Sequence, residues 1–299
     1  MRVDPQYLSQ TVAALDANSA VEQQLTEELS TGVKVNAISD DPAAFAENTI
    51  LSAQLSADDT FSQTASSAES LLQVSDTALG SVVTQLTQAI TLATQGVNGT
   101  QDSDNLKTIA TQLSGIRDEV LSLANSSYLG RYIFAGSQGG TTPFTLDEST
   151  APATVTYNGD DDVSYVNTPN GHTIQLNVPG DQIFTAAGAG VLGSLNTLIN
   201  DFASATASPT SVTDLNSLRG ALGYVDQQRT IIDNSISQFT AASNYGSSES
   251  LQLQSAQNSL LQTDTAQVAS QLSSAETQQA ALTQVIAAID QQGTLFSAL

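Results

Sequence analysis

Few side chains in this sequence could perform chemistry. His172 is the single imidazole, and cysteine is absent, which removes thiol nucleophiles, thiolate metal ligands and disulfides. The consecutive acids at 160–162 could offer oxygen ligands to a hard cation. The glycine and distal glutamate of a calcium-binding loop are missing, however, so a solvated turn is favoured. We therefore expect no catalytic site, no metal and no cofactor, in a protein that is not an enzyme.

The elements expected to hold these residues account for them without a ligand. His172 begins an alternation with Ile174 that continues through 176 and 178, which is typical of a strand. Tyr132 and Phe134 could stack on a ligand, but their spacing favours anchors of the first strand against a helix end.

The charge balance narrows the class of partner. The 299-residue chain carries 30 acidic and 7 basic side chains, a formal net charge of −23. Such an excess repels phosphate backbones and anionic headgroups, so we expect no nucleic acid partner. No apolar run is long enough to span a bilayer, and we expect no membrane insertion. The start lacks a basic-then-apolar signal, so we expect a cytoplasmic chain or export without a cleaved signal peptide.

Proline placement and apolar periodicity predict long helices. No proline lies within 43–142 or after 209, so a helix can run unbroken in both tracts. Apolar side chains step by three and four along 61–93, 106–123, 215–239 and 261–296. This stripe favours a coiled-coil rod, and the alternative is the inner face of a globular bundle.

The helical pattern is interrupted at two places. Glycines within 96–105 would end one helix, and Ser103 or Asp104 would cap the next. Between about 131 and 190, alternation of Val155 and Tyr157 with threonines, together with repeated turn chemistry, predicts antiparallel strands. This stretch has no basic residue from Tyr132 onward, so it presents only negative charge.

The expected fold is therefore mainly α, a long coiled-coil-like helical rod from the N- and C-terminal arms with a small inserted antiparallel β domain. We expect terminal assembly helices at 1–41 and 258–299. The helical rod would comprise 42–131 and 205–257, and a β-rich outer domain would comprise 132–204.

A polar bend, LSTGVKVNAISDDPAAFAEN at 29–48, separates the first two helical stretches. Gly32 suits a left-handed helix terminator, with Lys34 near the negative end of that helix. Asp41 can cap the next helix at Pro42, and Asp40 adds charge there.

Helix capping does not explain the apolar residues of the bend. Val33, Val35 and Ile38 lie in the loop, where apolar side chains need cover. That cover must come from the rest of the chain or from another copy.

Three stretches resemble the bacterial flagellin family. LSTGVKVNAISDDPAA at 29–44 is similar to its N-terminal signature, and LSSAETQQAALTQVIAAIDQQGTLFSAL at 272–299 is similar to its C-terminal helix. LANSSYLGRYIFAGSQ at 123–138 resembles the subgroup that joins the flagellar hook to the filament. Two positions depart from the family: Val33 replaces a residue that is often basic, and the closing TLFSAL lacks a common terminal base.

The resemblance implies a structural subunit that forms the junction layer between hook and filament by helical self-assembly. The implied partners are further copies, flagellin, other hook-associated proteins and an export chaperone. The implied location is extracellular, at the hook–filament junction. Segments near 1–40 and 258–299 would pair as helices in the assembled tube and be disordered in the monomer.

The expected assembly interface combines the bend with the apolar stripe of the C-terminal tract. It comprises Leu29, Gly32, Lys34, Asn36, Asp40, Asp41, Val268, Leu272, Leu282, Ile286, Ile289 and Phe296. The family motif comprises Gly130, Arg131, Tyr132, Phe134 and Gly136. Two alternative functions remain open at this point: a filament flagellin, and a secreted helical adhesin or effector whose β insert binds a surface ligand.

Overall fold

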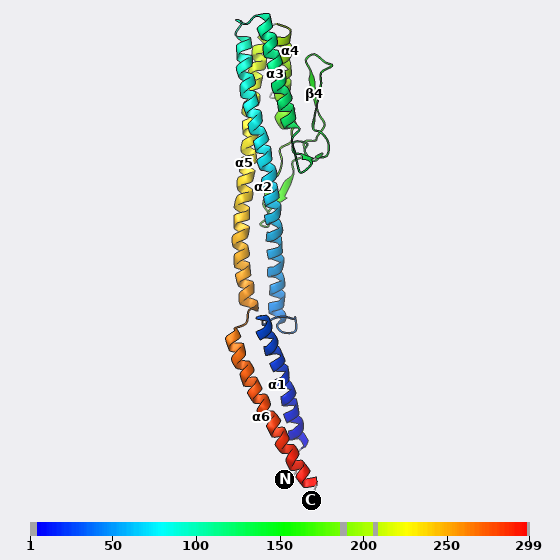
Figure 1. Ribbon diagram of the computed structural model, residues 1–299, viewed down its shortest axis with the longest axis vertical. Helices are drawn as coiled ribbons and strands as arrows, with labels where there is room; N and C mark the ends of the chain where they lie inside the picture. The colour runs from blue at the N-terminus through cyan, green and yellow to red at the C-terminus, as the bar shows by residue number, and fades with distance from the viewer. Residues whose placement is uncertain (1–4, 186–189, 206–208, 298–299) are drawn as a thin grey trace. The chain divides into compact units, whose positions relative to one another are not determined.

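The computed structural model describes the backbone of residues 5–185, 190–205 and 209–297, and the side chains of 9–185, 190–205 and 210–288. Within these residues the protein is mainly α-helical, and a small antiparallel β region lies between helices α3 and α4 (Figure 1). The predicted fold class, helical arms with inserted antiparallel strands, is confirmed. None of the described helices is long and apolar enough to cross a membrane.

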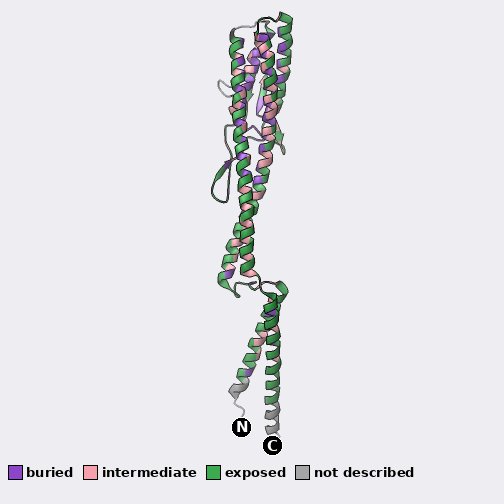
Figure 2. Ribbon diagram, turned by 90° about the vertical axis from the view of Figure 1, so that its left-hand side faces the viewer, coloured by how far each residue is buried: buried purple, intermediate pink, exposed green. Residues whose placement is uncertain are grey.

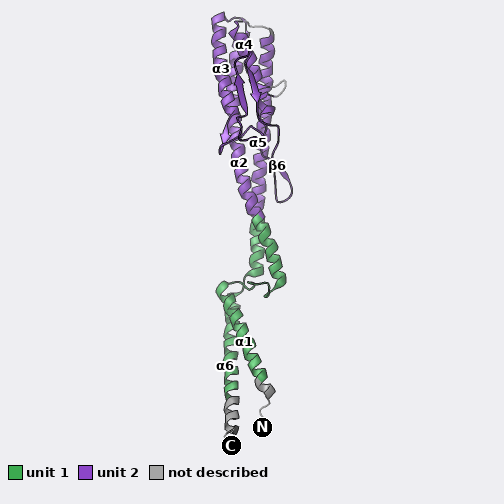
Figure 3. Ribbon diagram, turned by 90° about the vertical axis from the view of Figure 1, so that its right-hand side faces the viewer, with its two compact units in different colours: residues 1–56, 249–299 green, residues 57–248 purple. Residues whose placement is uncertain are grey.

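The chain divides into two compact units (Figure 3). Unit 1 combines residues 1–56 with 249–299, so segments from opposite ends of the sequence share one body. Unit 2 is the continuous stretch 57–248. The division into three parts expected from the sequence is a different partition and stays a prediction.

The helices form where proline is absent and apolar residues recur at helical spacing. Their bounds are α1 Pro5–Thr31, α2 Pro42–Val97, α3 Ser103–Ala124, α4 Val191–Ala203, α5 Pro209–Leu261 and α6 Thr265–Ser297. Helices α2 and α5, of 56 and 53 residues, contribute to both units. The cap of α3 differs from expectation: Asp102 Oδ1, rather than Ser103 or Asp104, accepts a hydrogen bond of 2.8 Å from Asn105 N.

Unit 2 has one large hydrophobic core, visible as the purple residues of Figure 2. Every member of the predicted stripe of α2 from Phe61 to Ala93 is buried, because α3, α4 and α5 supply residues to the same core. The packing is close: a Cβ placed on Gly96 would lie 2.6 Å from the ring of Phe202. Asp76 and Arg229 connect α2 to α5, with 2.8 Å between Oδ1 and Nε and 3.2 Å between Oδ2 and Nη2.

The strands form three separate two-stranded antiparallel sheets. They are β1 Ser127–Tyr128 with β2 Arg131–Tyr132, β3 Phe144–Asp147 with β4 Thr154–Tyr157, and β5 Tyr165–Asn167 with β6 Thr173–Gln175. The predicted strand position of His172 is wrong. This exposed residue lies in the turn before β6, where its carbonyl oxygen accepts a hydrogen bond from Thr168 N.

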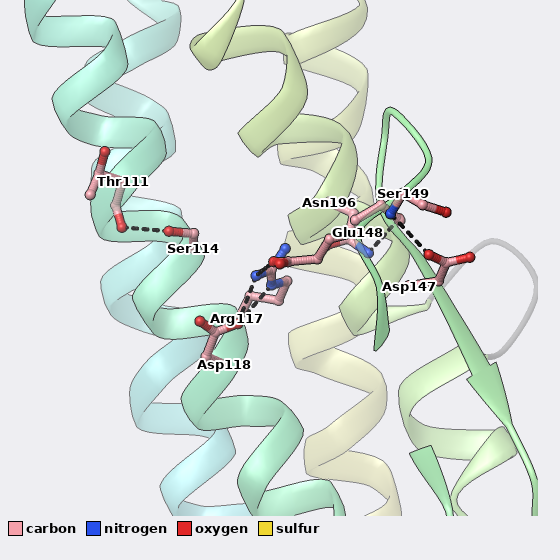
Figure 4. A network of polar contacts seen from close by, with 9 residues as sticks. Thr111, Ser114, Arg117, Asp118, Asp147, Glu148, Ser149 and Asn196 are labelled. Carbon is pink, nitrogen blue, oxygen red and sulfur yellow. Dashed lines mark hydrogen bonds and ion pairs between the residues drawn. The ribbon is translucent and has the colours of Figure 1, made fainter. Parts of the chain in front are cut away.

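A buried arginine attaches the β3–β4 hairpin to the helices (Figure 4). Arg117 on α3 is only 5% exposed, and its Nη2 lies 2.7 Å from both Asp118 Oδ1 and Glu148 Oε1. On the other side, Asn196 Nδ2 of α4 donates to Ala153 O at 2.7 Å. The hairpin is thus held by two polar connections in addition to its apolar contacts.

Candidate assembly interface

The bend after α1 is built from local hydrogen bonds. Gly32 has φ +71° and its N–H donates to Glu28 O at 2.8 Å, which ends α1 at Thr31. A residue with a side chain is strained at this φ, so glycine suits the position. The predicted role of Gly32 as helix terminator is confirmed.

The paired aspartates have two separate roles in the bend. Asp41 Oδ1 accepts hydrogen bonds from the N–H groups of Ala43 and Ala44 at 2.9 and 3.0 Å, so it caps α2 as predicted. Asp40 Oδ2 instead accepts from Ala37 N at 2.9 Å and Asn36 N at 3.0 Å, which closes the loop before the helix. These two donors, Ala37 first, hold the pKa of Asp40 below its usual range because they stabilise the carboxylate.

A second connecting segment lies against the bend. Lys34 N donates to Leu261 O at 2.8 Å, Thr263 N donates to Gly32 O at 3.1 Å, and Val33 forms an antiparallel bridge with Gln262. The α1–α2 and α5–α6 connections are therefore hydrogen-bonded to each other within unit 1. Sequence reasoning missed this pairing, and the boundary it placed at 258 falls inside α5, which runs to Leu261.

The signal for the break between α5 and α6 was present in the sequence. Asp264 Oδ1 accepts from Ala266 N at 3.0 Å and Gln267 N at 3.2 Å, as an N-cap does. The cap makes Thr265 the first residue of α6.

The apolar residues of the bend are covered unequally. Val35 is buried at 8% exposure and Val33 is half-buried, so the chain itself covers both. Ile38 is 63% exposed. The bend thus presents an apolar side chain to solvent beside the exposed Lys34.

Helices α1 and α6 meet along a narrow seam. Leu25, Val268 and Ala275 are its buried apolar side chains in the described part of unit 1, and Leu272 packs against them. Polar contacts continue the seam: Asn18 Nδ2 donates to Ala275 O at 2.9 Å, and Gln279 Nε2 donates to Ser19 Oγ at 3.2 Å.

The predicted interface residues are therefore partly brought together. Leu272, Leu282 and Ile286 are half-buried, whereas Leu29 is 39% exposed. The side chains of Ile289 and Phe296 lie outside the described residues. Whether these residues form an interface between copies stays a prediction.

The second predicted group, the motif at 130–136, lies in unit 2, where Phe134 and Gly136 serve packing. Phe134 is buried against Phe184, with ring centroids 5.4 Å apart, and its carbonyl oxygen accepts from Tyr157 OH at 3.0 Å and Gly180 N at 2.9 Å. Gly136 has φ +64°, and a Cβ there would collide with Asp160. Phe134 thus packs within the β region, whereas the expectation placed it as an anchor of the first strand against a helix end.

The phenol of Tyr157 is held in its neutral form where β4 lies beside Phe134. Its OH donates to Asp160 O at 2.7 Å as well as to Phe134 O. Burial, followed by the negative charge of Asp181, raises the pKa of Tyr157 to about 12. Among the acids at 160–162, Asp160 accepts hydrogen bonds from Ser137 N, Ser137 Oγ and Asp162 N. No cluster suited to a metal ion is present among the described residues.

The comparisons with known proteins point to the bacterial flagellins. Residues 6–139 match the family described as the bacterial flagellin N-terminal helical region. Within this class, the chain is similar to Flagellar hook-associated protein 3. It is 30% identical to that protein of Salmonella typhimurium strain LT2 over 188 residues, covering 62% of this chain and 57% of the relative. It is 31% identical to that of Escherichia coli strain K12 over 150 residues, covering 50% and 47%.

A solved structure supports the fold independently. Flagellar hook associated protein-3 from Legionella pneumophila superposes with a TM-score of 0.65 at 13% identity, over 71% of this chain and 98% of that one. The chain spans about half the length of the curated relatives it matches. The resemblance to the flagellin family, and within it to hook-associated protein 3, is confirmed.

Proposed function

We propose that this protein is a structural subunit of the bacterial flagellum that forms the junction layer between hook and filament by helical self-assembly. The proposal is for a structural role, without catalysis. Support for the junction comes from the relatives, which are named as hook-associated proteins. The observation that carries self-assembly is the incomplete burial of the paired terminal helices in unit 1.

The seam between α1 and α6 is too thin for the length of its helices. Helices in proteins gain most of their stability from packing of an apolar face. This pair of 27 and 33 residues, however, buries few apolar side chains in its described part. Val12, Val21, Leu29 and Val285 remain between 39% and 48% exposed. Burying such side chains contributes about 25 cal/mol per Å² of apolar area, so neighbouring terminal pairs have a reason to associate.

The charge pattern of α6 favours the same outcome. From 265 to 297 it contains the acids Glu276 and Asp290 and no basic residue. Because α6 carries so few charges, the α6 helices of two copies can approach each other with little like-charge repulsion. The chain as a whole is strongly acidic, so other surfaces of two copies repel each other more. Head-to-tail contacts that do not close on themselves generate helical assemblies.

The partners and location follow from the junction role. One face of the layer would contact other hook-associated proteins, and the opposite face would contact flagellin. A chaperone would keep the terminal segments apart before export. The protein would then leave through the flagellar export route without a cleaved signal and become extracellular.

Deletion of the gene in the source bacterium tests the proposal against both alternatives. A junction subunit predicts hooks without filaments, with unpolymerised flagellin released into the medium, and full recovery when the wild-type gene is restored. Shortened or altered filaments would indicate a filament flagellin instead. Normal flagella with a loss of surface attachment would indicate an adhesin.

A further inference from the structure

The turn between β1 and β2 holds a large apolar side chain in a strained and exposed position. Leu129 has φ +50° and Gly130 has φ +78°, the pattern of a type I′ turn. Asn-Gly is the favoured pair in such turns, whereas a leucine at positive φ is uncommon and costs free energy. Leu129 is 86% exposed, so burial within its own chain does not compensate for this strain. Strain that folding does not use points to a role in function.

Arg131 follows directly on the return strand, and no salt bridge connects it to another described residue. Arg117 and Arg229 each pair with carboxylates, but Arg131 makes no ion pair with any described residue. Its side chain lies across Gly139, where an added Cβ would come within 2.8 Å of Arg131 Nε. The full chain carries 30 acidic and 7 basic side chains. A guanidinium that forms no ion pair with a described residue is available for an external carboxylate.

A cavity of about 360 Å³ lies beside this turn. It is lined by Leu129, Arg131, Tyr128 and Tyr132 of the hairpin, together with Leu71 of α2 and Val166 of β5. The apolar lining residues can contact an aliphatic stem, and Arg131 can bind a carboxylate at the end of that stem. The turn thus combines a projecting apolar group with a receiving cavity.

We propose that the β1–β2 turn is a contact point for a second copy of this chain, with Leu129 as the apolar anchor and Arg131 bound to a carboxylate of the neighbour. This inference rests on the proposed function, because it assumes that copies lie side by side. The occupant is inferred from the local charge of the turn: the guanidinium of Arg131 binds a carboxylate, and each neighbouring copy carries 30 acidic side chains that can supply one. The contact is heterologous, since the turn of one copy meets a different surface of the next.

The variant Leu129→Asn separates assembly from folding. It creates the favoured Asn-Gly pair, so the Tm of the purified chain should stay equal or rise. It also removes the apolar anchor, so recovery of the protein in detached flagella should fall about tenfold relative to the amount exported, as expected when a central anchor is lost. The matched control is Val212→Asn, which removes an exposed apolar side chain elsewhere in unit 2 and should assemble normally.

The variant Arg131→Gln tests the ionic part of the contact. Its recovery in flagella should also fall, whereas Arg219→Gln should have no effect because Arg219 has partners in its own chain, Asn216 and Thr94. Normal recovery of both Leu129→Asn and Arg131→Gln would overturn this inference while leaving the proposed function intact. Absence of the wild-type protein from flagella would overturn the proposed function and this inference together.

Cross-linking identifies the occupant directly. The chain has no cysteine, so a single Ser127→Cys variant, at an exposed position of β1 that leaves Leu129 in place, carries a photoactivatable thiol reagent at one site. Irradiation of assembled flagella should give a product of twice the chain mass that contains only this protein. A product joined to flagellin or to another hook-associated protein would contradict a second copy as the occupant, and so would the absence of any product.

Discussion

The same sequence pattern has different consequences in the two units of this protein. In unit 2 the apolar stripe of α2 is covered by residues of α3, α4 and α5, and a cluster of phenylalanines closes the core beneath the strands. In unit 1 the comparable stripe of α6 packs against α1, and its described part buries few side chains. An apolar stripe therefore stabilises a monomer only when enough helices of that monomer cover it. We propose that a stripe with one neighbour is a surface for assembly.

The largest effect on the isolated chain is expected from the core of unit 2. Phe184 is fully buried, with ring centroids 5.4 Å from Phe134 and 5.2 Å from Phe144. Phe184→Ala should lower the free energy of unfolding by about 3–5 kcal/mol in urea denaturation, because it removes apolar contacts and leaves a cavity. Leu272→Ala, in the thin seam of unit 1, should cost the monomer about 1 kcal/mol or less. Equal losses for the two variants would remove the contrast between the units.

The next effect concerns assembly rather than folding. Leu272→Asp or Ile286→Asp would place a charge on the stripe that we propose associates with other copies, at a cost of about 2–3 kcal/mol for each site that is buried on assembly. Incorporation into flagella should be lost, while the helical circular dichroism of the purified chain should change little. Ser273→Asp, at an exposed position next to the stripe, is the matched control. Normal incorporation of both stripe variants would show that the stripe has no part in assembly.

A smaller and local effect is expected at the bend. Asp41→Ala removes the side chain that caps α2 and should destabilise the start of this helix by about 1 kcal/mol. Hydrogen exchange of residues 43–46 should accelerate, whereas exchange in the core of unit 2 should stay unchanged. Exchange that accelerates throughout the chain would show that the bend supports more than unit 1.

The last effect appears only at alkaline pH and lies in unit 2. The pKa of Tyr157 is raised to about 12 from a usual value of 10.0, so the neutral phenol is favoured by folding. Its contribution is fully present below pH 10 and is lost as the pH rises toward 12. The Tm of the wild type should therefore fall more steeply above pH 10 than the Tm of Tyr157→Phe, which lacks the titrating group. Parallel curves would assign the alkaline loss to other groups.

Much of the helical architecture follows from local chemistry and could be predicted. The proline-free tract with its three-and-four spacing predicted α2, and Gly32 and Asp41 marked the end of one helix and the start of the next because both act through neighbouring backbone groups. The resemblance at 123–138 pointed to Phe134 as a motif residue, and the structure shows it packed against Phe184.

Features that depend on distant contacts were beyond the sequence. The pairing of Val33 with Gln262 joins opposite ends of the chain, and no local pattern marks it. Arg117 reads as a surface residue of α3 but is buried, because Glu148 reaches it from a hairpin formed later in the sequence. His172 fits the alternation of a strand, yet the turn it closes with Thr168 prevails over the pattern.

Limited proteolysis of the purified full-length monomer, with a protease of broad specificity and mass spectrometry of the fragments, tests the central contrast most directly. The predicted result is rapid loss of α1 and α6 and survival of a fragment close to residues 57–248, with the terminal helices protected once the protein is incorporated into flagella. Equal resistance of both units in the free monomer would contradict a terminal pair that depends on neighbouring copies.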